Sequence, residues 1–179
     1  MHRRDENMFE EKNWRQLKLV SLFAGVEGMK LEAGEGHQQK MDEAALFPDG
    51  GGTGRFEEDI AWDLVGYGFI GLKRGMSPFA GEEGGELLKI DIAFEKERVA
   101  LELDGPTHFL KSLEEKGEGE EPRRDGPTKA KTRLMESLRW QVFRHSYLSN
   151  MKLKRMPEEK RREFWVKELG VFGVEPSKK

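Results

Sequence analysis

Acidic side chains stand among alternating apolar residues in two adjoining stretches of residues 89–104. Asp91 belongs to the first stretch, and Glu102 and Asp104 belong to the second. Carboxylate oxygens are the ligands that hard cations such as Mg²⁺ prefer in proteins. These residues therefore suggest a divalent-metal site; the alternative is a solvated pair of strands on which Lys89 neutralises its acidic neighbours.

Apolar residues alternate with other residues on both sides of residues 95–98. This alternation predicts a β-hairpin, and the pairing of residues across its two strands can be worked out. With the turn centred between Lys96 and Glu97, every apolar residue lies opposite an apolar partner. Two carboxylates then meet across the strands with Cβ atoms roughly 5 Å apart, which is destabilising unless something compensates their charge. The predicted pairs are Phe94 with Val99, Ala93 with Ala100, Ile92 with Leu101, Asp91 with Glu102, Ile90 with Leu103 and Lys89 with Asp104.

His108 follows the second strand after the turn-forming dipeptide Gly105-Pro106. Such a turn can bring the imidazole back toward the carboxylates. An imidazole can move a proton or contact a phosphate near neutral pH, although a structural role is the alternative. The candidate catalytic residues are therefore Asp91, Glu102, Asp104 and His108.

Charge is divided unevenly along the chain. The net charge is −3, but residues 1–121 carry −12 and residues 122–179 carry +9. Such a split favours a basic face for an anionic partner such as nucleic acid, or two tails that attract each other. Cations at a helix start oppose the helix dipole, a cost that is easier to understand if they face phosphate; the alternative is an ordinary solvated face. Five basic residues precede or begin a helix predicted within 123–140: Arg123, Arg124, Lys129, Lys131 and Arg133.

Four further elements must position these residues. An amphipathic helix is predicted from Arg55 to Gly66, a strand over 140–147, and a last helix from Pro157 to Gly170, while Thr128 is expected to cap the helix within 123–140. The order helix, hairpin, helix, strand, helix predicts a small α/β fold in which a crossover helix joins strands of a mixed sheet. The expected apolar stripes are Phe56, Ile60, Leu64 and Val65; Leu134, Met135 and Leu138; and Phe164, Trp165 and Leu169.

The composition predicts one domain with tails. The chain has 179 residues, 36% of them charged, and a mean hydropathy of −0.77. Residues 1–54 are expected to be a low-complexity, poorly ordered region, residues 55–172 the domain, and residues 173–179 a tail. The absence of cysteine excludes disulfides and thiolate zinc sites. No apolar run approaches the roughly 18 residues of a membrane span, and no targeting peptide is recognisable.

The ordered set of motifs between about residues 56 and 170 resembles the RAP domain. This is an RNA-binding domain named for its abundance in apicomplexan proteins and found in the FAST kinase family of mitochondrial RNA regulators. The positions that carry the resemblance are Asp91, LELDGPTHF at 101–109, DGPTKAKTRL at 125–134, Trp140 and Tyr147. The chain departs from the family pattern at Arg139, where a glycine usually precedes the tryptophan.

The resemblance implies a restriction-endonuclease-like three-layer fold in which helices flank a mixed sheet. This is the PD-(D/E)XK fold of the very-short-patch-repair type of endonuclease. Asp91, Glu102 and Asp104 stand where that fold binds a divalent metal such as Mg²⁺, although Asp104 occupies a position that usually holds lysine. The resemblance also implies single-stranded or structured organellar RNA as the partner, and a mitochondrion or another organelle as the location.

Three functions follow, and we expect them in this order because the family is chiefly one of RNA-binding domains. The first is RNA binding in organellar RNA processing or stability, with the five basic residues on the phosphate backbone. The second is a Mg²⁺-dependent endoribonuclease, in which His108 moves a proton beside the metal-bound carboxylates. The third is a degenerate nuclease fold that serves as a protein-interaction module, because one fold hosts many functions.

Overall fold

The computed structural model describes residues 18, 21, 54–79, 88–109 and 123–177. Predictions for the rest of 1–54, for the loop 110–122 and for residues 178–179 lie outside the described residues. The chain forms two compact units, residues 53–76 with 90–179, and residues 1–52 with 77–89. The first unit contains every strand and helix discussed below.

Four strands form one mixed sheet in the order β1-β2-β3-β4. The pairs β1–β2 and β2–β3 are antiparallel, whereas β3 and β4 run parallel and are joined through helix α4. The crossover helix and the mixed sheet confirm the predicted α/β class. The strands are β1 (Leu72–Met76), β2 (Ile90–Phe94), β3 (Val99–Asp104) and β4 (Gln141–Ser146).

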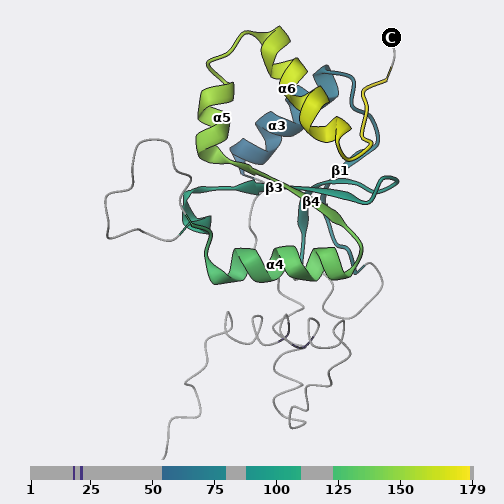
Figure 1. Ribbon diagram of the computed structural model, residues 1–179, viewed down its shortest axis with the longest axis vertical. Helices are drawn as coiled ribbons and strands as arrows, with labels where there is room; N and C mark the ends of the chain where they lie inside the picture. The colour runs from purple at the N-terminus through teal and green to yellow at the C-terminus, as the bar shows by residue number, and fades with distance from the viewer. Residues whose placement is uncertain (1–17, 19–20, 22–53, 80–87, 110–122, 178–179) are drawn as a thin grey trace, which may run out of the picture. The chain divides into compact units, whose positions relative to one another are not determined.

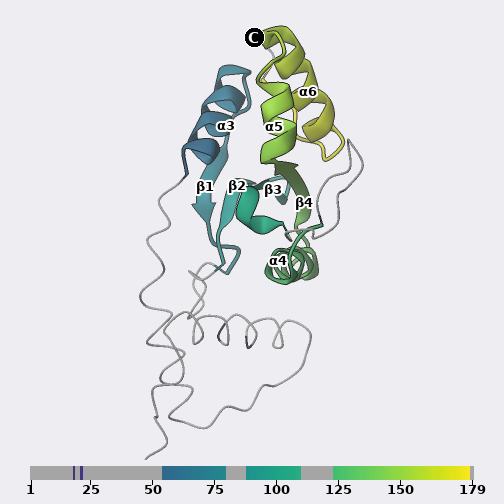
Figure 2. The ribbon, with the colours of Figure 1, turned by 90° about the vertical axis from the view of Figure 1, so that its left-hand side faces the viewer.

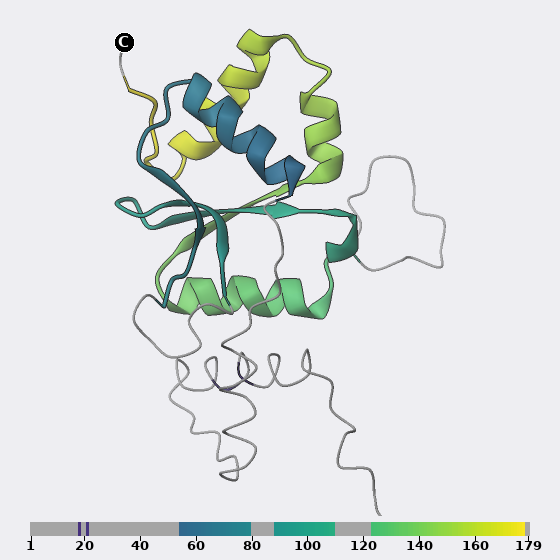
Figure 3. The same ribbon diagram turned by 180° about the vertical axis from the view of Figure 1, so that it is seen from behind.

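Helices cover both faces of the sheet, so the domain has three layers (Figures 1, 2 and 3). Helix α4 lies on one face, and α3, α5 and α6 lie on the other. A short 3₁₀ turn, η2, follows β3. The helices are α3 (Arg55–Gly66), η2 (Pro106–His108), α4 (Gly126–Ser137), α5 (Tyr147–Leu153) and α6 (Glu158–Gly170).

The predicted hairpin register is confirmed for the three pairs next to the turn. Phe94 pairs with Val99, Ala93 with Ala100, and Ile92 with Leu101. Within the described strands the β2–β3 register ends there. The Asp91 carboxylate instead accepts the Leu103 N–H at 2.7 Å, so the predicted backbone pairs Ile90 with Leu103 and Asp91 with Glu102 are not formed.

The main core lies between the sheet and the layer of α3 and α6. Ile92 and Leu101 on the strands and Trp165 on α6 are fully buried there, each contributing about 1.5–3 kcal/mol from burial. Successive residues of a strand point to opposite faces. Since Leu101 faces this core, Glu102 and Asp104 face α4.

Several local predictions were wrong. Asp125, not Thr128, caps α4 by accepting the Thr128 N–H at 2.8 Å, because a carboxylate placed before the first turn reaches this N–H. Val65 is exposed rather than buried. Tyr147 begins α5 instead of ending the last strand, since the Ser146 hydroxyl accepts the Ser149 N–H and starts a helix. Neither α5 nor β1 was predicted.

Candidate functional site

Asp104 is the centre of a buried cluster of charged side chains at the end of β3. Its side chain is fully buried, and both oxygens accept hydrogen bonds: Arg124 Nε donates at 2.7 Å, Arg144 Nη2 at 2.5 Å, and Arg144 Nε at 3.0 and 3.1 Å. His108 Nδ1 lies 3.4 Å from the carboxylate. Burial alone would raise the pKa of Asp104, but the hydrogen bonds from His108, Arg144 and Arg124 hold this pKa well below its usual range. Asp104 is therefore an anion enclosed by cations.

Arg144 comes from β4, where the parallel register places it beside Glu102. Its neighbours in sequence, Phe143 and His145, point to the opposite face and pack on Trp165. The guanidinium also donates to the Thr132 hydroxyl of α4 at 2.9 Å. Burial lowers the pKa of Arg144, but the hydrogen bond to Asp104 and the negative charges of Asp104, Glu102 and Asp91 together outweigh it, so the net shift is upward. Arg144 thus ties β3, β4 and α4 together.

Glu102 is buried on the same face of β3, with 1% of its side chain exposed. Lys131 of α4 places its ammonium 2.5 Å from Oε2, and Arg144 Nη2 lies 3.7 Å from the same oxygen. The other oxygen, Oε1, has no hydrogen-bond partner among the described residues. Burial raises the pKa of Glu102, and the nearby Asp91 carboxylate adds to this, against the lowering effect of Lys131.

Two other predicted site residues lie at the margin of this cluster. Asp91 is half-buried on β2 and uses one oxygen to accept the Leu103 N–H. His108 lies in η2 with 40% of its side chain exposed. The hydrogen bond to Asp104 raises the pKa of His108 despite partial burial, and Thr128 Oγ1 lies 3.4 Å from the same ring nitrogen. The four candidate catalytic residues are thus near one another, but His108 is bound to Asp104.

The five predicted phosphate contacts divide into two groups. Arg124 and Lys131 are committed to the buried acids, as described above. Arg123, Lys129 and Arg133 are exposed, and none of them has an ion pair within the described part of the chain. Lys129 and Arg133 lie four residues apart on α4, so their side chains share one face of the helix. This leaves three cations for an external anion.

Sequence reasoning missed three charged residues around the site. Arg144 was assigned only to a predicted strand. Because it lies two residues from both Val142 and Ser146, its side chain points to the same face of that strand as theirs. Glu57 of α3 accepts a hydrogen bond from Arg74 of β1 at 3.2 Å. Burial raises the pKa of Glu57, and Asp91 adds to the shift. Glu57 lies in the helix predicted from Arg55 to Gly66, but the apolar pattern of that helix gave it no role at the site.

The three carboxylates predicted to bind Mg²⁺ differ in how many free acceptor oxygens they have in the described structure. Among residues 54–79, 88–109 and 123–177, no group of three or more His, Asp and Glu side chains is arranged to hold a metal ion. Both Asp104 oxygens already accept hydrogen bonds. Asp91 and Glu102 each keep one oxygen without a protein donor in the described structure. Mg²⁺ is usually held by one or two carboxylates together with water and phosphate oxygens, so Asp91 and Glu102 keep the acceptor oxygens that the ion would need, whereas Asp104 does not.

These observations define the class: a mixed α/β domain with a buried network of acidic and basic side chains between its sheet and α4. A comparison with protein-family models finds no match. A comparison with curated proteins finds none either. The resemblance to the RAP domain therefore stays a prediction. Within the described residues, no helix has the length and apolar character needed to cross a membrane.

Proposed function

We propose that this chain is an RNA-binding domain of the RAP type, with a restriction-endonuclease-like fold, that acts in organellar RNA processing or stability. One observation carries the proposal: the acids of the sheet are neutralised by basic side chains from within the fold. Asp104 is enclosed by Arg124, Arg144 and His108, and Glu102 is paired with Lys131. The remaining cations of this segment stay exposed. Such an arrangement suits the binding of an anion better than the binding of a metal.

The exposed cations support contact with a phosphate backbone. Lys129 and Arg133 are one helical turn apart, with Cβ atoms roughly 5–6 Å apart, and Arg123 precedes the helix. Basic side chains contribute salt-dependent affinity that depends little on base sequence, because they release the counterions condensed on the phosphates. Contacts of this kind position RNA, whereas contacts to base edges specify its sequence.

The backbone at Arg139 also supports the family resemblance. Arg139 has φ 63°, in the left-handed region that glycine occupies at least cost. Its N–H donates to the carbonyl of Glu136 at 2.9 Å, and the Trp140 N–H donates to that of Met135 at 2.9 Å, which together make a Schellman motif after α4. The family pattern has glycine at this position, so the structure supplies a physical reason for that glycine.

Binding to labelled single-stranded RNA over a range of salt concentrations tests the proposal. Replacing both Lys129 and Arg133 by Ala should weaken binding and reduce the slope of log K against log salt by about 1.4, since each phosphate contact adds about 0.7 for single strands. The control is the Lys152→Ala, Arg155→Ala variant, which removes two exposed cations of the α5 end. Equal slopes for the two variants and the wild type would reject phosphate binding by α4.

The unpaired Glu102 oxygen favours a second candidate, a Mg²⁺-dependent endoribonuclease. Asp91 and Glu102 would hold the ion, which would supply an activated water when bound. Asp91→Asn should then abolish RNA cleavage in Mg²⁺ while leaving binding in EDTA unchanged. Cleavage that survives this substitution, or that proceeds in EDTA, would exclude the scheme. Equal binding without cleavage by both proteins would support a binding domain.

A further inference from the structure

Two arginines have a left-handed backbone conformation in the described parts of the chain, where every other residue with a positive φ is a glycine. Arg98 has φ 56° and ends the turn between β2 and β3, and Arg139 has φ 63° and follows α4. Glycine occupies this region at least cost, and arginine is uncommon there. Residues held in such conformations cluster at binding and catalytic sites, where the surrounding structure enforces them.

The two strained positions meet at the carboxyl end of α4. The Arg98 carbonyl accepts the Gln141 N–H at 2.8 Å, and the Arg98 guanidinium donates to the carbonyl of Leu138. The guanidinium also lies over the ring of Trp140, 4.7 Å from the ring centroid. Arg98 therefore contacts residues on both sides of Arg139 and lies beside it.

These contacts explain Arg98 but not Arg139. A cation that donates to the last carbonyls of a helix stabilises its carboxyl end, so Arg98 has a structural role. The Arg139 side chain is exposed and makes no hydrogen bond, ion pair or ring contact with the described residues. Two exposed acids are close in the sequence, Glu97 and Glu136, but neither pairs with an arginine in the described structure. Arg139 thus keeps its guanidinium in solvent despite the strain of its backbone.

We propose that Arg98 and Arg139 form a second phosphate-binding subsite for RNA, at the opposite end of α4 from Arg123. This inference rests on the proposed function, because it assigns further contacts to the same partner. Guanidinium groups suit phosphate, since their planar fork of donors matches two phosphate oxygens. α4 has 12 residues and is therefore about 18 Å long. A strand of RNA that contacts both ends of the helix would span about five phosphates, at the roughly 3.4 Å spacing of a stacked strand.

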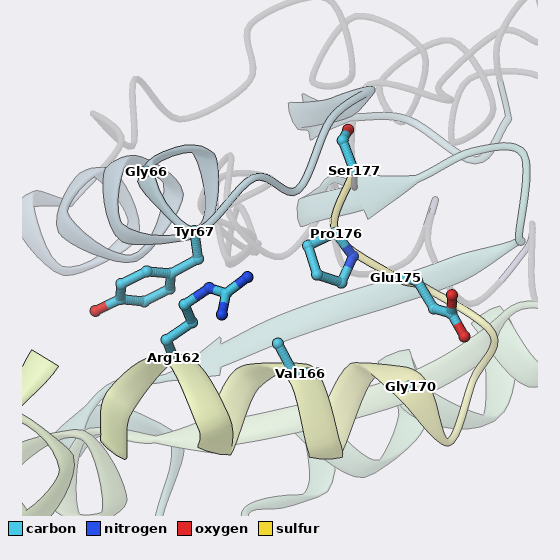
Figure 4. A pocket seen from close by; sticks show the side chains of 8 residues that line it. All are labelled: Gly66, Tyr67, Arg162, Val166, Gly170, Glu175, Pro176 and Ser177. Atoms are coloured by element: carbon cyan, nitrogen blue, oxygen red, sulfur yellow. The ribbon is translucent and has the colours of Figure 1, made fainter. Parts of the chain in front are cut away.

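The pocket at the carboxyl ends of α3 and α6 contains an arginine with an ordinary backbone. The pocket has a volume of about 440 Å³, and Figure 4 shows Arg162 of α6 in its wall beside Tyr67 and Pro176. Arg162 is exposed and has no ion pair in the described structure, but its backbone is helical. Glu175 also lines the pocket, so the charges there do not favour an anion. Since α6 covers the opposite face of the sheet from α4 (Figure 1), Arg162 is a matched control for the loss of one exposed guanidinium.

Binding of the whole chain to labelled single-stranded RNA over a range of salt concentrations tests the proposal. Arg139→Gly should reduce the slope of log K against log salt by about 0.7, and R98G/R139G should reduce it by about 1.4, since each phosphate contact adds about 0.7 for single strands. The affinity lost in Arg139→Gly should therefore shrink about 2.6-fold between about 50 and 200 mM salt. Arg139→Lys keeps the cation and should keep the wild-type slope, as should Arg162→Ala.

Thermal melts of the same variants separate binding from folding. Arg139→Gly relieves the backbone strain, so its thermal midpoint should rise while its RNA affinity falls. Equal slopes for the wild type and R98G/R139G would overturn the subsite, as would an equal loss of slope in Arg139→Lys or Arg162→Ala. If the variant without Lys129 and Arg133 loses slope and R98G/R139G does not, the subsite fails and the proposed function stands. The reverse result supports the subsite and rejects the contacts of Lys129 and Arg133, and a wild type that does not bind RNA rejects both.

Discussion

Asp104→Asn is the substitution that most directly tests the role of the buried carboxylate. The change keeps the size of the side chain but removes the main counter-ion of the Arg144 guanidinium, which is 8% exposed and keeps only Glu102 Oε2, at 3.7 Å, as an anionic partner in the described structure. Removing one partner of a buried ion pair costs about 3–5 kcal/mol, because the other charge stays buried and unpaired. The Asn oxygen can still accept one hydrogen bond, so we expect a loss near the lower end, about 3 kcal/mol. That is a large part of the roughly 5–15 kcal/mol by which domains of this size are stable.

The loss should depend on pH in a definite direction. The pKa of Asp104 in the folded chain lies below its ordinary value of 3.8. A carboxyl group whose pKa is lowered by folding contributes stability above its unfolded pKa, and this contribution is lost as the pH falls through the folded pKa. The difference between the wild type and Asp104→Asn should therefore be full at neutral pH and should shrink below about pH 4.

Urea denaturation followed by circular dichroism measures this difference as a shift of the midpoint at constant m. Glu136→Gln, at an exposed acid of α4, is the matched control and should change stability by less than about 0.5 kcal/mol. Mg²⁺ provides a further comparison, since a ligand that binds the folded state stabilises it. A loss below about 1 kcal/mol, or a stabilisation by Mg²⁺ that Asp104→Asn removes, would refute the structural role.

Three further substitutions test local features of the fold by the same assay. Arg139→Gly should stabilise the chain by about 0.5–1 kcal/mol, because glycine adopts the positive φ without steric cost; unchanged or lower stability would contradict this reading of the turn. Asp125→Ala should cost about 1 kcal/mol through loss of the α4 cap, and a neutral result would mean that the cap is dispensable. His108→Gln should destabilise the chain more at about pH 5.5 than at about pH 9, because a group whose pKa is raised by folding stabilises only below that pKa. The effect should stay under about 1 kcal/mol because the imidazole is partly exposed, and equal losses at both pH values would refute the ion pair with Asp104.

Periodicity was sufficient to predict the elements whose apolar faces are regular. The hairpin register near the turn follows from matching apolar residues across two strands, and Ile92 opposite Leu101 is the result. Helix α3 follows from Ile60 and Leu64 at helical spacing. Strand β1 has no such pattern, since Lys73 and Arg74 interrupt it and Gly75 has a positive φ. Its position depends on pairing with β2, which a local pattern does not encode.

The composition of the charged cluster could be predicted only in part. Alternation places Glu102 and Asp104 on one face of β3, but it cannot say which side chains meet them there. Arg144 meets both because the parallel crossover brings β4 beside β3, and Lys131 meets Glu102 because α4 packs on that face. These contacts join residues that are distant in the sequence. Carboxylates that suggested a metal site were therefore found neutralised by cations from other elements.

This arrangement changes what the acidic motif implies about function. Glu102 and Asp104 hold Lys131, Arg124 and Arg144, and through them they fix α4 against the sheet. The exposed cations of α4 depend on that helix for their position, so loss of Asp104 would weaken the proposed RNA binding even though Asp104 is not among the proposed phosphate contacts. A defect caused by replacing Asp104 therefore gives no evidence for catalysis. Among the described residues, Asp91 has an oxygen without a protein donor and pairs with none of these cations, so its substitution would separate the proposed nuclease from the proposed binding domain.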